Sequence, residues 1–134
     1  MLLTLITGPL PEEPGWRGTA YPRLRSRMGR APALLVLSTI WAIWHLPLFF
    51  IPGTLQHGWG LDSWSGVFFL LAIYPITALT CFAYERAGFA GAAAVHFGVN
   101  GAIVLLGISG PPALGMSAAV LAVVAAFVLM VRPS

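Results

Sequence analysis

Two adjacent acidic residues, Glu12 and Glu13, lie near the start of a chain that otherwise carries few charges. They belong to the run Leu-Pro-Glu-Glu-Pro-Gly-Trp-Arg-Gly, in which Arg17 follows Glu13 by four positions. Carboxylates beside hydrocarbon cost free energy unless they are paired, hydrogen-bonded or neutralised. If the run is helical, Glu13 pairs with Arg17, whereas Glu12 projects about 100° away and is not paired by Arg17. Glu12 is therefore the better candidate for a general base, and Pro14 predicts an irregular turn beside it.

Three further polar residues, His45, His96 and Asn100, fall inside long apolar stretches. Asn100 follows His96 by one helical turn, so both side chains project from one face and can act on the same substrate atom. Trp41 precedes His45 by the same spacing, so its ring can orient the imidazole. Each signal alone is weak, because an intramembrane His or a His/Asn pair more often joins two helices by a hydrogen bond. Their coexistence with Glu12 favours a chemical site.

The composition indicates an integral membrane protein that forms a single membrane domain over residues 1–134. Hydrophobic residues make up 58% of the chain and charged residues 8%, against roughly 25% charged residues in soluble domains. All seven basic residues are Arg, and five of them lie between residues 17 and 30. Beside a membrane this cluster predicts contact with anionic headgroups, and it lacks the interleaved aromatic residues of a nucleic-acid surface. No nucleic-acid partner is expected, and the single Cys81 excludes an internal disulfide.

Four apolar stretches have close to the roughly 20 residues that a membrane-spanning helix requires. They cover residues 32–51, 64–84, 89–108 and 113–131. The predicted fold class is all-α, a polytopic membrane helix bundle of about four spans. The acidic run is expected to form a short N-terminal helix or re-entrant segment before them. Residues 21–30 predict a short interfacial segment, and residues 52–63 predict a turn-rich loop.

The distribution of Arg also predicts the orientation of the spans. With four spans, the Arg-rich segment 17–30, Arg86 and Arg132 fall on one side of the membrane, and two loops without Arg fall on the other. By the positive-inside rule the side that carries Arg is cytoplasmic. We therefore expect a multi-pass protein of the cell membrane.

Three motifs follow one another along the chain: Glu12-Glu13-x-x-x-Arg17, Trp41-x-x-x-His45 followed by Leu-Pro-Leu-Phe, and His96-x-x-x-Asn100. This ordered set resembles the CPBP family of intramembrane endopeptidases, also called the CAAX protease and bacteriocin-processing or Abi family. The runs Glu-Glu-Pro-Gly-Trp-Arg-Gly and Trp-His-Leu-Pro-Leu-Phe are similar to bacterial members in particular. The resemblance covers about residues 8–105 and leaves an extra C-terminal helix at about 113–131. The full set in order is a specific match, whereas any one motif is not.

The resemblance implies an all-helical membrane enzyme in which a glutamate activates water for attack on a peptide carbonyl. Glu12 would be the catalytic base, and His45 would help to hold the water. His96 and Asn100 would bind the oxyanion. The implied activity is that of a metal-independent intramembrane glutamic endopeptidase with no cofactor. Its partners would be the lipid bilayer and a peptide or protein substrate within or at the membrane.

The same resemblance assigns supporting roles to three residues. Glu13 and Arg17 would form a structural ion pair, and Trp41 would stand at a packing position where the family commonly has Phe. Family members generally carry several helices before the Glu-Glu motif, whereas only a short apolar stretch precedes it here. Residues 1–10 are too few to cross a bilayer. We therefore expect them to be the tail of a longer helix, and the chain to be a short or N-terminally truncated member.

Three other interpretations are compatible with these residues. A divalent metal such as zinc, held by Glu12, His45 and His96, ranks second, because the chain has no His-Glu-x-x-His spacing. A non-catalytic membrane protein that acts in bacteriocin self-immunity or partner binding would carry the same motifs without hydrolysis. A small transporter would use His45 and His96 as a proton relay, but the chain lacks a repeat between its halves.

Overall fold

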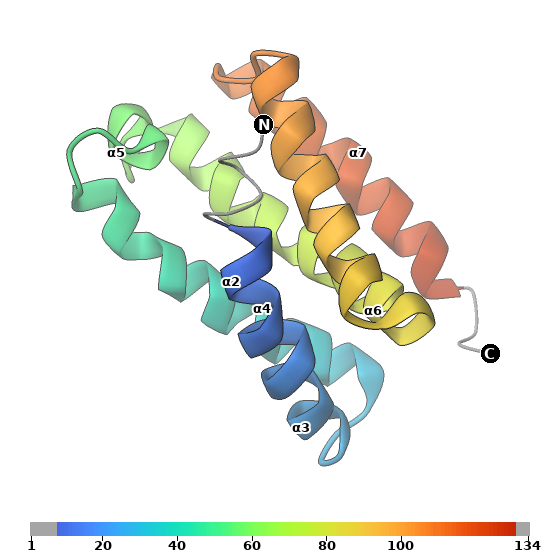
Figure 1. Cartoon of the computed structure of the whole chain (residues 1–134). Coiled ribbons are helices and arrows are strands. Elements are labelled where there is room, and N and C mark those ends of the chain that lie inside the picture. Colours follow the sequence, from blue (N-terminus) through green and yellow to red (C-terminus); the bar gives the residue numbers. More distant parts are fainter. Residues whose placement is uncertain (1–7, 131–134) are drawn as a thin grey trace.

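The computed structural model describes residues 8–130 as an assembly of helices, with no strand in that range (Figure 1). This arrangement confirms the predicted all-α fold. The predicted helical tail at residues 1–10 falls largely outside the described residues, and so does Arg132. The elements in chain order are α2 (Pro9–Gly15), the π-helical turn η1 (Trp16–Ala20), α3 (Tyr21–Arg25), α4 (Arg30–His45), the 3₁₀ turn η2 (Leu46–Phe50), α5 (Leu55–Trp59), α6 (Trp64–Leu105) and α7 (Pro111–Met130).

Three helices among the described residues are long and apolar enough to cross a membrane: Arg30–Phe50, Trp64–Leu105 and Pro111–Met130. At 42 residues, α6 has about twice the length that one crossing needs. Its backbone leaves helical geometry at Ala87 and Gly88, and the chain reverses direction there (Figure 1). The two halves of α6 correspond to the predicted second and third spans, but the third ends at Leu105 rather than at residue 108.

The reversal within α6 brings its two halves into close contact. A Cβ atom placed on Gly91 would lie 2.7 Å from the carbonyl oxygen of Ala83. In a continuous helix these two residues would be about 12 Å apart along the axis. The small side chain at position 91 therefore allows the second half of α6 to pack against the first directly after the turn.

Gly88 is expected to be the residue on which this turn depends. Its φ of 61° and ψ of −153° lie in a region that is open essentially to Gly alone. We expect Gly88→Ala to lower the free energy of unfolding by about 1–3 kcal/mol, measured by thermal unfolding in detergent. Gly98→Ala is the matched control, because Gly98 lies within α6 with no atom near its missing Cβ. Equal stability of the two variants would contradict this account of the turn.

Pro14 disturbs the helix that carries the acidic pair. Proline has no amide hydrogen, and its ring clashes with the carbonyl group four residues earlier. The next turn is η1, which ends with a hydrogen bond from the Tyr21 amide to the Trp16 carbonyl, five residues earlier. The Thr19 hydroxyl donates to the Pro14 carbonyl at 3.1 Å. The predicted irregular turn is confirmed, and its form is a π-helical turn.

Tyr21 anchors α3 to the helices behind it. Its ring is buried in an apolar cluster. Its hydroxyl donates a hydrogen bond to Oε1 of Glu85, while Nη2 of Arg30 lies 2.9 Å from Oε2 of the same carboxylate. These contacts hold α3, the start of α4 and the turn of α6 together at one end of the bundle. The apolar cluster consists of Tyr21, Ala33, Leu34, Leu37, Ala78, Cys81 and Ala125.

The Tyr21 anchor predicts a loss of stability at alkaline pH. Burial, and then the hydrogen bond to Glu85, raise the pKa of Tyr21 above its ordinary value of 10.0. Protonated Tyr21 contributes fully to stability at any pH below the pKa that this residue has in the unfolded chain. This contribution is lost as the pH rises above that value, because Tyr21 releases its proton first in the unfolded chain. We expect the free energy of unfolding to fall between about pH 10 and 12. Denaturant unfolding of Tyr21→Phe should show a smaller fall, and an equal fall in both proteins would contradict the assignment.

The segment predicted as a turn-rich loop, residues 52–63, contains the short helix α5. Thr54 caps this helix by accepting a hydrogen bond from the His57 amide at 3.1 Å. The Thr54 hydroxyl also donates to the carbonyl of Leu48, which ties α5 to η2. The prediction of a loop was therefore wrong over Leu55–Trp59, where a short helix forms after Thr54. The interfacial segment predicted at 21–30 is helical over Tyr21–Arg25.

Candidate active site

Glu13 is buried and binds two side chains through one oxygen. Its Oε1 accepts a hydrogen bond from Nη1 of Arg17 at 2.9 Å and another from Nδ1 of His96 at 2.8 Å. Glu13 and Arg17 are both 0% exposed. A buried charge requires this kind of pairing, since an unpaired one would be costly. The predicted ion pair is therefore present, and it also connects α2 to the second half of α6.

Glu12, next along the chain, faces a different way. Its Oε2 accepts a hydrogen bond from the indole nitrogen of Trp41 at 3.0 Å. Arg17 bonds to Glu13 and not to Glu12, as the helical spacing predicted. Oε1 of Glu12 has no hydrogen-bond partner among residues 8–130, and the side chain is half-buried at the edge of a cavity. Glu12 is thus a carboxylate with Oε2 fixed by Trp41 and Oε1 free to bind a ligand.

The His45 ring is fixed by the backbone of its own helix. Its Nδ1 lies 2.7 Å from the carbonyl oxygen of Trp41, and a carbonyl can only accept. Nδ1 therefore donates, and in the neutral ring Nε2 is the nitrogen that accepts a hydrogen bond. The ring also packs edge-on against Trp41 and Phe69, with centroids 5.6 Å and 5.4 Å away.

One cavity of about 230 Å³ is lined by all four residues to which a chemical role was assigned. Glu12 comes from α2, His45 from the end of α4, and His96 and Asn100 from the second half of α6. The four-residue spacing of His96 and Asn100 places both side chains on one face of α6, as predicted. The other lining residues are Leu48, Leu55, Gln56, Trp59, Phe69, Ile103 and Val104.

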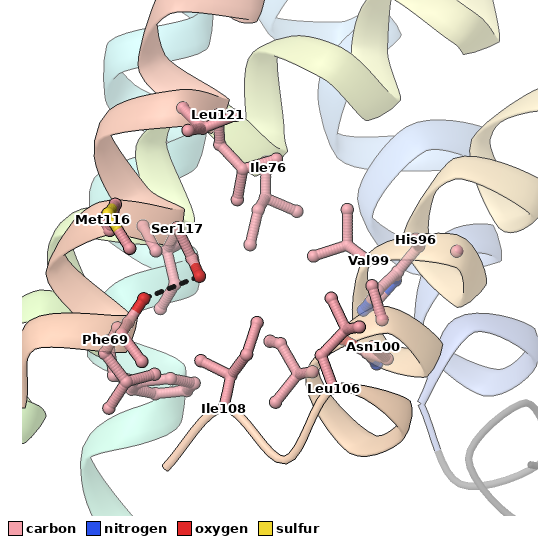
Figure 2. Close-up of a pocket in the computed structure, with 18 of the residues that line it drawn as sticks. Phe69, Ile76, His96, Val99, Asn100, Leu106, Ile108, Met116, Ser117 and Leu121 are labelled. Atoms are coloured by element: carbon pink, nitrogen blue, oxygen red, sulfur yellow. Dashed lines mark hydrogen bonds between the residues drawn. The ribbon is translucent and has the colours of Figure 1, made fainter. Parts of the chain in front are cut away.

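A second, larger cavity of about 600 Å³ adjoins the first. His45, His96 and Asn100 line both, so the polar groups lie where the two cavities meet. Elsewhere its walls are almost wholly apolar and come from Trp41 of α4, the two halves of α6, the turn after α6 and α7. Figure 2 shows His96 and Asn100 on one side and Ser117 of α7 on the opposite side. The Ser117 hydroxyl donates to the Ala113 carbonyl at 2.7 Å, so it presents no free donor to the cavity.

The zinc alternative is not supported by the arrangement of side chains. No three His, Cys, Asp or Glu side chains in the described part of the chain are grouped as a metal site requires. Glu12, His45 and His96, the set considered for zinc, line one cavity without forming such a group. His96 also uses Nδ1 for Glu13, which leaves only Nε2 for any other ligand.

Some lining residues were not among the predicted site residues. Gln56 and Trp59 come from α5, the helix that replaced the expected loop, and Phe69 comes from the first half of α6. The side-chain amide of Gln56 has no hydrogen-bond partner among the described residues. Thr54 is a favourable N-cap residue, so it is the local signal that could have predicted the helix that carries Gln56. The bond between Glu13 and His96 had no local signal, because 83 positions separate the two residues.

Comparisons with known proteins agree with the three motifs. The chain matches the family model described as type II CAAX prenyl endopeptidase Rce1-like over residues 1–102. It is 34% identical over 77 residues to CAAX prenyl protease 2 of Methanococcus maripaludis. That alignment covers 57% of this chain but only 28% of the length of the relative. No solved structure matches the chain significantly. The resemblance to the CAAX proteases is confirmed, and the chain belongs to the Rce1-like family of type II CAAX prenyl endopeptidases.

Proposed function

We propose that this chain hydrolyses a peptide bond at the membrane, with Glu12 as the base that activates water. The observation that carries the proposal is the convergence of Glu12, His45, His96 and Asn100 on one cavity of about 230 Å³. These residues come from three separate helical elements, so their meeting is a property of the fold. A carboxylate, an imidazole acceptor and two possible oxyanion donors are the groups that acyl transfer to water requires.

The first step uses Glu12 and His45 together. A water molecule in the cavity donates one hydrogen bond to the free Oε1 of Glu12 and the other to Nε2 of His45. Glu12 takes a proton as the water oxygen attacks the peptide carbonyl carbon. The tetrahedral intermediate then collapses, the carbon–nitrogen bond breaks, and the proton passes from Glu12 to the leaving amine. No metal ion is needed, because the carboxylate supplies the base.

The second part of the proposal concerns the oxyanion. Asn100 can donate through its amide nitrogen, and His96 can donate only through Nε2, because Nδ1 already donates to Glu13. His96 must therefore carry both ring protons when it binds the oxyanion. The Glu13 carboxylate at 2.8 Å supports that positive charge. In this role Glu13 orients a catalytic imidazole in addition to pairing with Arg17.

The larger apolar cavity suggests the class of substrate. The relative from Methanococcus maripaludis is named a CAAX prenyl protease. A volume of about 600 Å³ lies within the range of small-molecule sites, and an apolar wall suits an isoprenoid chain. A prenylated peptide could place its lipid in this cavity while the scissile bond lies beside His96 and Asn100. We propose a prenylated C-terminal peptide as the substrate.

The charged end of the bundle suggests the orientation in the membrane. Arg30, Glu85 and Tyr21 meet at that end, which also carries the exposed Arg23 and Arg27. Under the positive-inside rule this end faces the cytoplasm. The active-site cavity lies at the opposite end of α4, beside His45 and η2. In this orientation the cavity lies nearer the non-cytoplasmic end of the bundle, so a peptide must reach it from the lipid or from that end.

Reconstitution tests the function directly. We expect the purified full chain in liposomes to cleave a reporter peptide that ends in a prenylated Cys, and to cleave the same peptide without the prenyl group at least about tenfold more slowly. Mass spectrometry of the products identifies the cleaved bond. His45→Ala, purified in parallel, controls for a contaminating protease. Equal cleavage by wild type and His45→Ala would contradict the proposal, and specific partner binding without cleavage would favour the non-catalytic alternative.

A further inference from the structure

Trp41 contacts four ionisable side chains of the site, those of Glu12, His45, His96 and Arg17. Its indole nitrogen donates to Glu12, and its ring lies 5.2 Å from the His96 ring and 5.6 Å from the His45 ring between centroids. The guanidinium carbon of Arg17 lies 4.2 Å from the ring centroid. The side chain is 2% exposed, so these contacts are made in a closed environment. Packing explains the ring contacts, but it does not explain the hydrogen bond to Glu12.

The indole group suits a holding role because it can only donate. It does not accept a hydrogen bond and does not ionise near neutral pH, so it cannot compete with Glu12 as a base. The ring is rigid, and the contacts with Arg17 and both imidazoles fix its orientation. Its N–H group therefore reaches one oxygen of Glu12 from a fixed direction. The second oxygen, Oε1, remains free for a ligand in the cavity.

We propose that Trp41 is a positioning residue for the catalytic base: its indole N–H fixes Oε2 of Glu12, so that Oε1 is the oxygen that takes the proton from water. The inference rests on the proposed hydrolytic function. It assigns to Trp41 a role that a Phe ring could not fill, since Phe has no donor. It also predicts that the ring and the N–H group contribute separately.

Loss of the N–H group should affect catalysis through the orientation of Glu12. The carboxylate would no longer be held in one orientation, so fewer bound substrates would meet a correctly placed base. The other ionisable side chains that line the cavity are His45 on α4 and His96 on α6, and α5 adds none. These two residues keep their own hydrogen-bond partners in a Trp41→Phe variant.

The kinetic test compares Trp41→Phe with Trp44→Phe on the reporter peptide. Trp44 lies on the same helix, is 58% exposed and packs against Trp16 without lining either cavity. We expect Trp41→Phe to lower kcat by roughly 10- to 100-fold, the effect of one hydrogen bond to a charged group. KM should stay within about twofold. Trp44→Phe should leave both kcat and KM unchanged. A kcat within about twofold of wild type, or a rise in KM as large as the fall in kcat, would reduce Trp41 to a packing residue and overturn the inference.

A spectroscopic test does not depend on turnover. The chain contains five Trp residues, so its indole ¹H–¹⁵N spectrum is simple, and the resonance missing from Trp41→Phe identifies Trp41. We expect this resonance to shift in Glu12→Ala and to remain in place in Trp44→Phe. A Trp41 resonance that does not shift in Glu12→Ala would overturn the inference. If wild type fails to cleave while the resonance responds, the hydrolytic function fails and the contact between Trp41 and Glu12 stands.

Discussion

Glu12→Gln is expected to lower the rate of peptide hydrolysis by about 10³- to 10⁴-fold, while KM changes little. Gln has nearly the shape of Glu, and its carbonyl oxygen can still accept the hydrogen bond from Trp41. It cannot take a proton from water at neutral pH. The variant thus removes the base and keeps the geometry around it. Cleavage of the prenylated reporter in liposomes measures the effect.

Asp62→Asn is a suitable control for the Glu12 experiment. Asp62 is an exposed acid outside both cavities, so its replacement removes the same charge without touching the site. Activity near the wild-type level is expected in this control. Unfolding measurements on Glu12→Gln should match those of wild type. A Glu12→Gln protein that is fully folded and fully active would refute the proposed mechanism.

Glu13→Ala is expected to destabilise the fold by about 3–5 kcal/mol, because it leaves the Arg17 guanidinium buried without its partner. Glu13 and Arg17 are both fully buried, so water cannot replace the lost interaction. His96 would lose the acceptor of its Nδ1 proton at the same time. Denaturant unfolding in detergent gives the change in free energy. A change below about 1 kcal/mol would contradict the interpretation of this buried pair.

A double variant separates the two roles of Glu13. In Glu13→Leu/Arg17→Met both charges are absent, and a buried pair replaced by apolar residues is often close to neutral in stability. The Met side chain can also keep contact with the Trp41 ring. We expect stability to recover while hydrolysis remains low, because His96 still lacks the carboxylate that orients it. Recovery of full activity would show that Glu13 matters only for folding.

The parts of the site that could be predicted depend on short-range spacing. Glu13 and Arg17 lie four residues apart on one helix, and so do His96 and Asn100, so helical geometry alone places each pair. The apolar stretches likewise predicted the spans, with errors of a few residues at their ends. The Gly88 turn falls between the second and third predicted spans, where Glu85 and Arg86 interrupt the apolar residues.

The contacts that could not be predicted join distant segments. Trp41 and Glu12 are 29 positions apart, and His96 and Glu13 are 83 apart. Nothing in the local sequence distinguishes a Trp that packs from a Trp that donates to a carboxylate. The motifs predicted only a structural ion pair for Glu13 for the same reason. They related His96 to Asn100, one helical turn away, and gave no sign of its contact with Glu13. α5 was missed because its five residues are too few for a periodic pattern.

The π-helical turn η1 sets the rotational phase between the acidic pair and the α3 anchor. Eight residues separate Glu13 from Tyr21, and in a uniform α-helix they would turn through about 800°, roughly 80° past two full turns. The π-helical turn takes in one additional residue, so both side chains return to the buried face. The connection therefore contains one residue more than a continuous α-helix would need. Shortening it by one residue would leave both faces aligned, whereas lengthening it would turn Tyr21 out of the bundle.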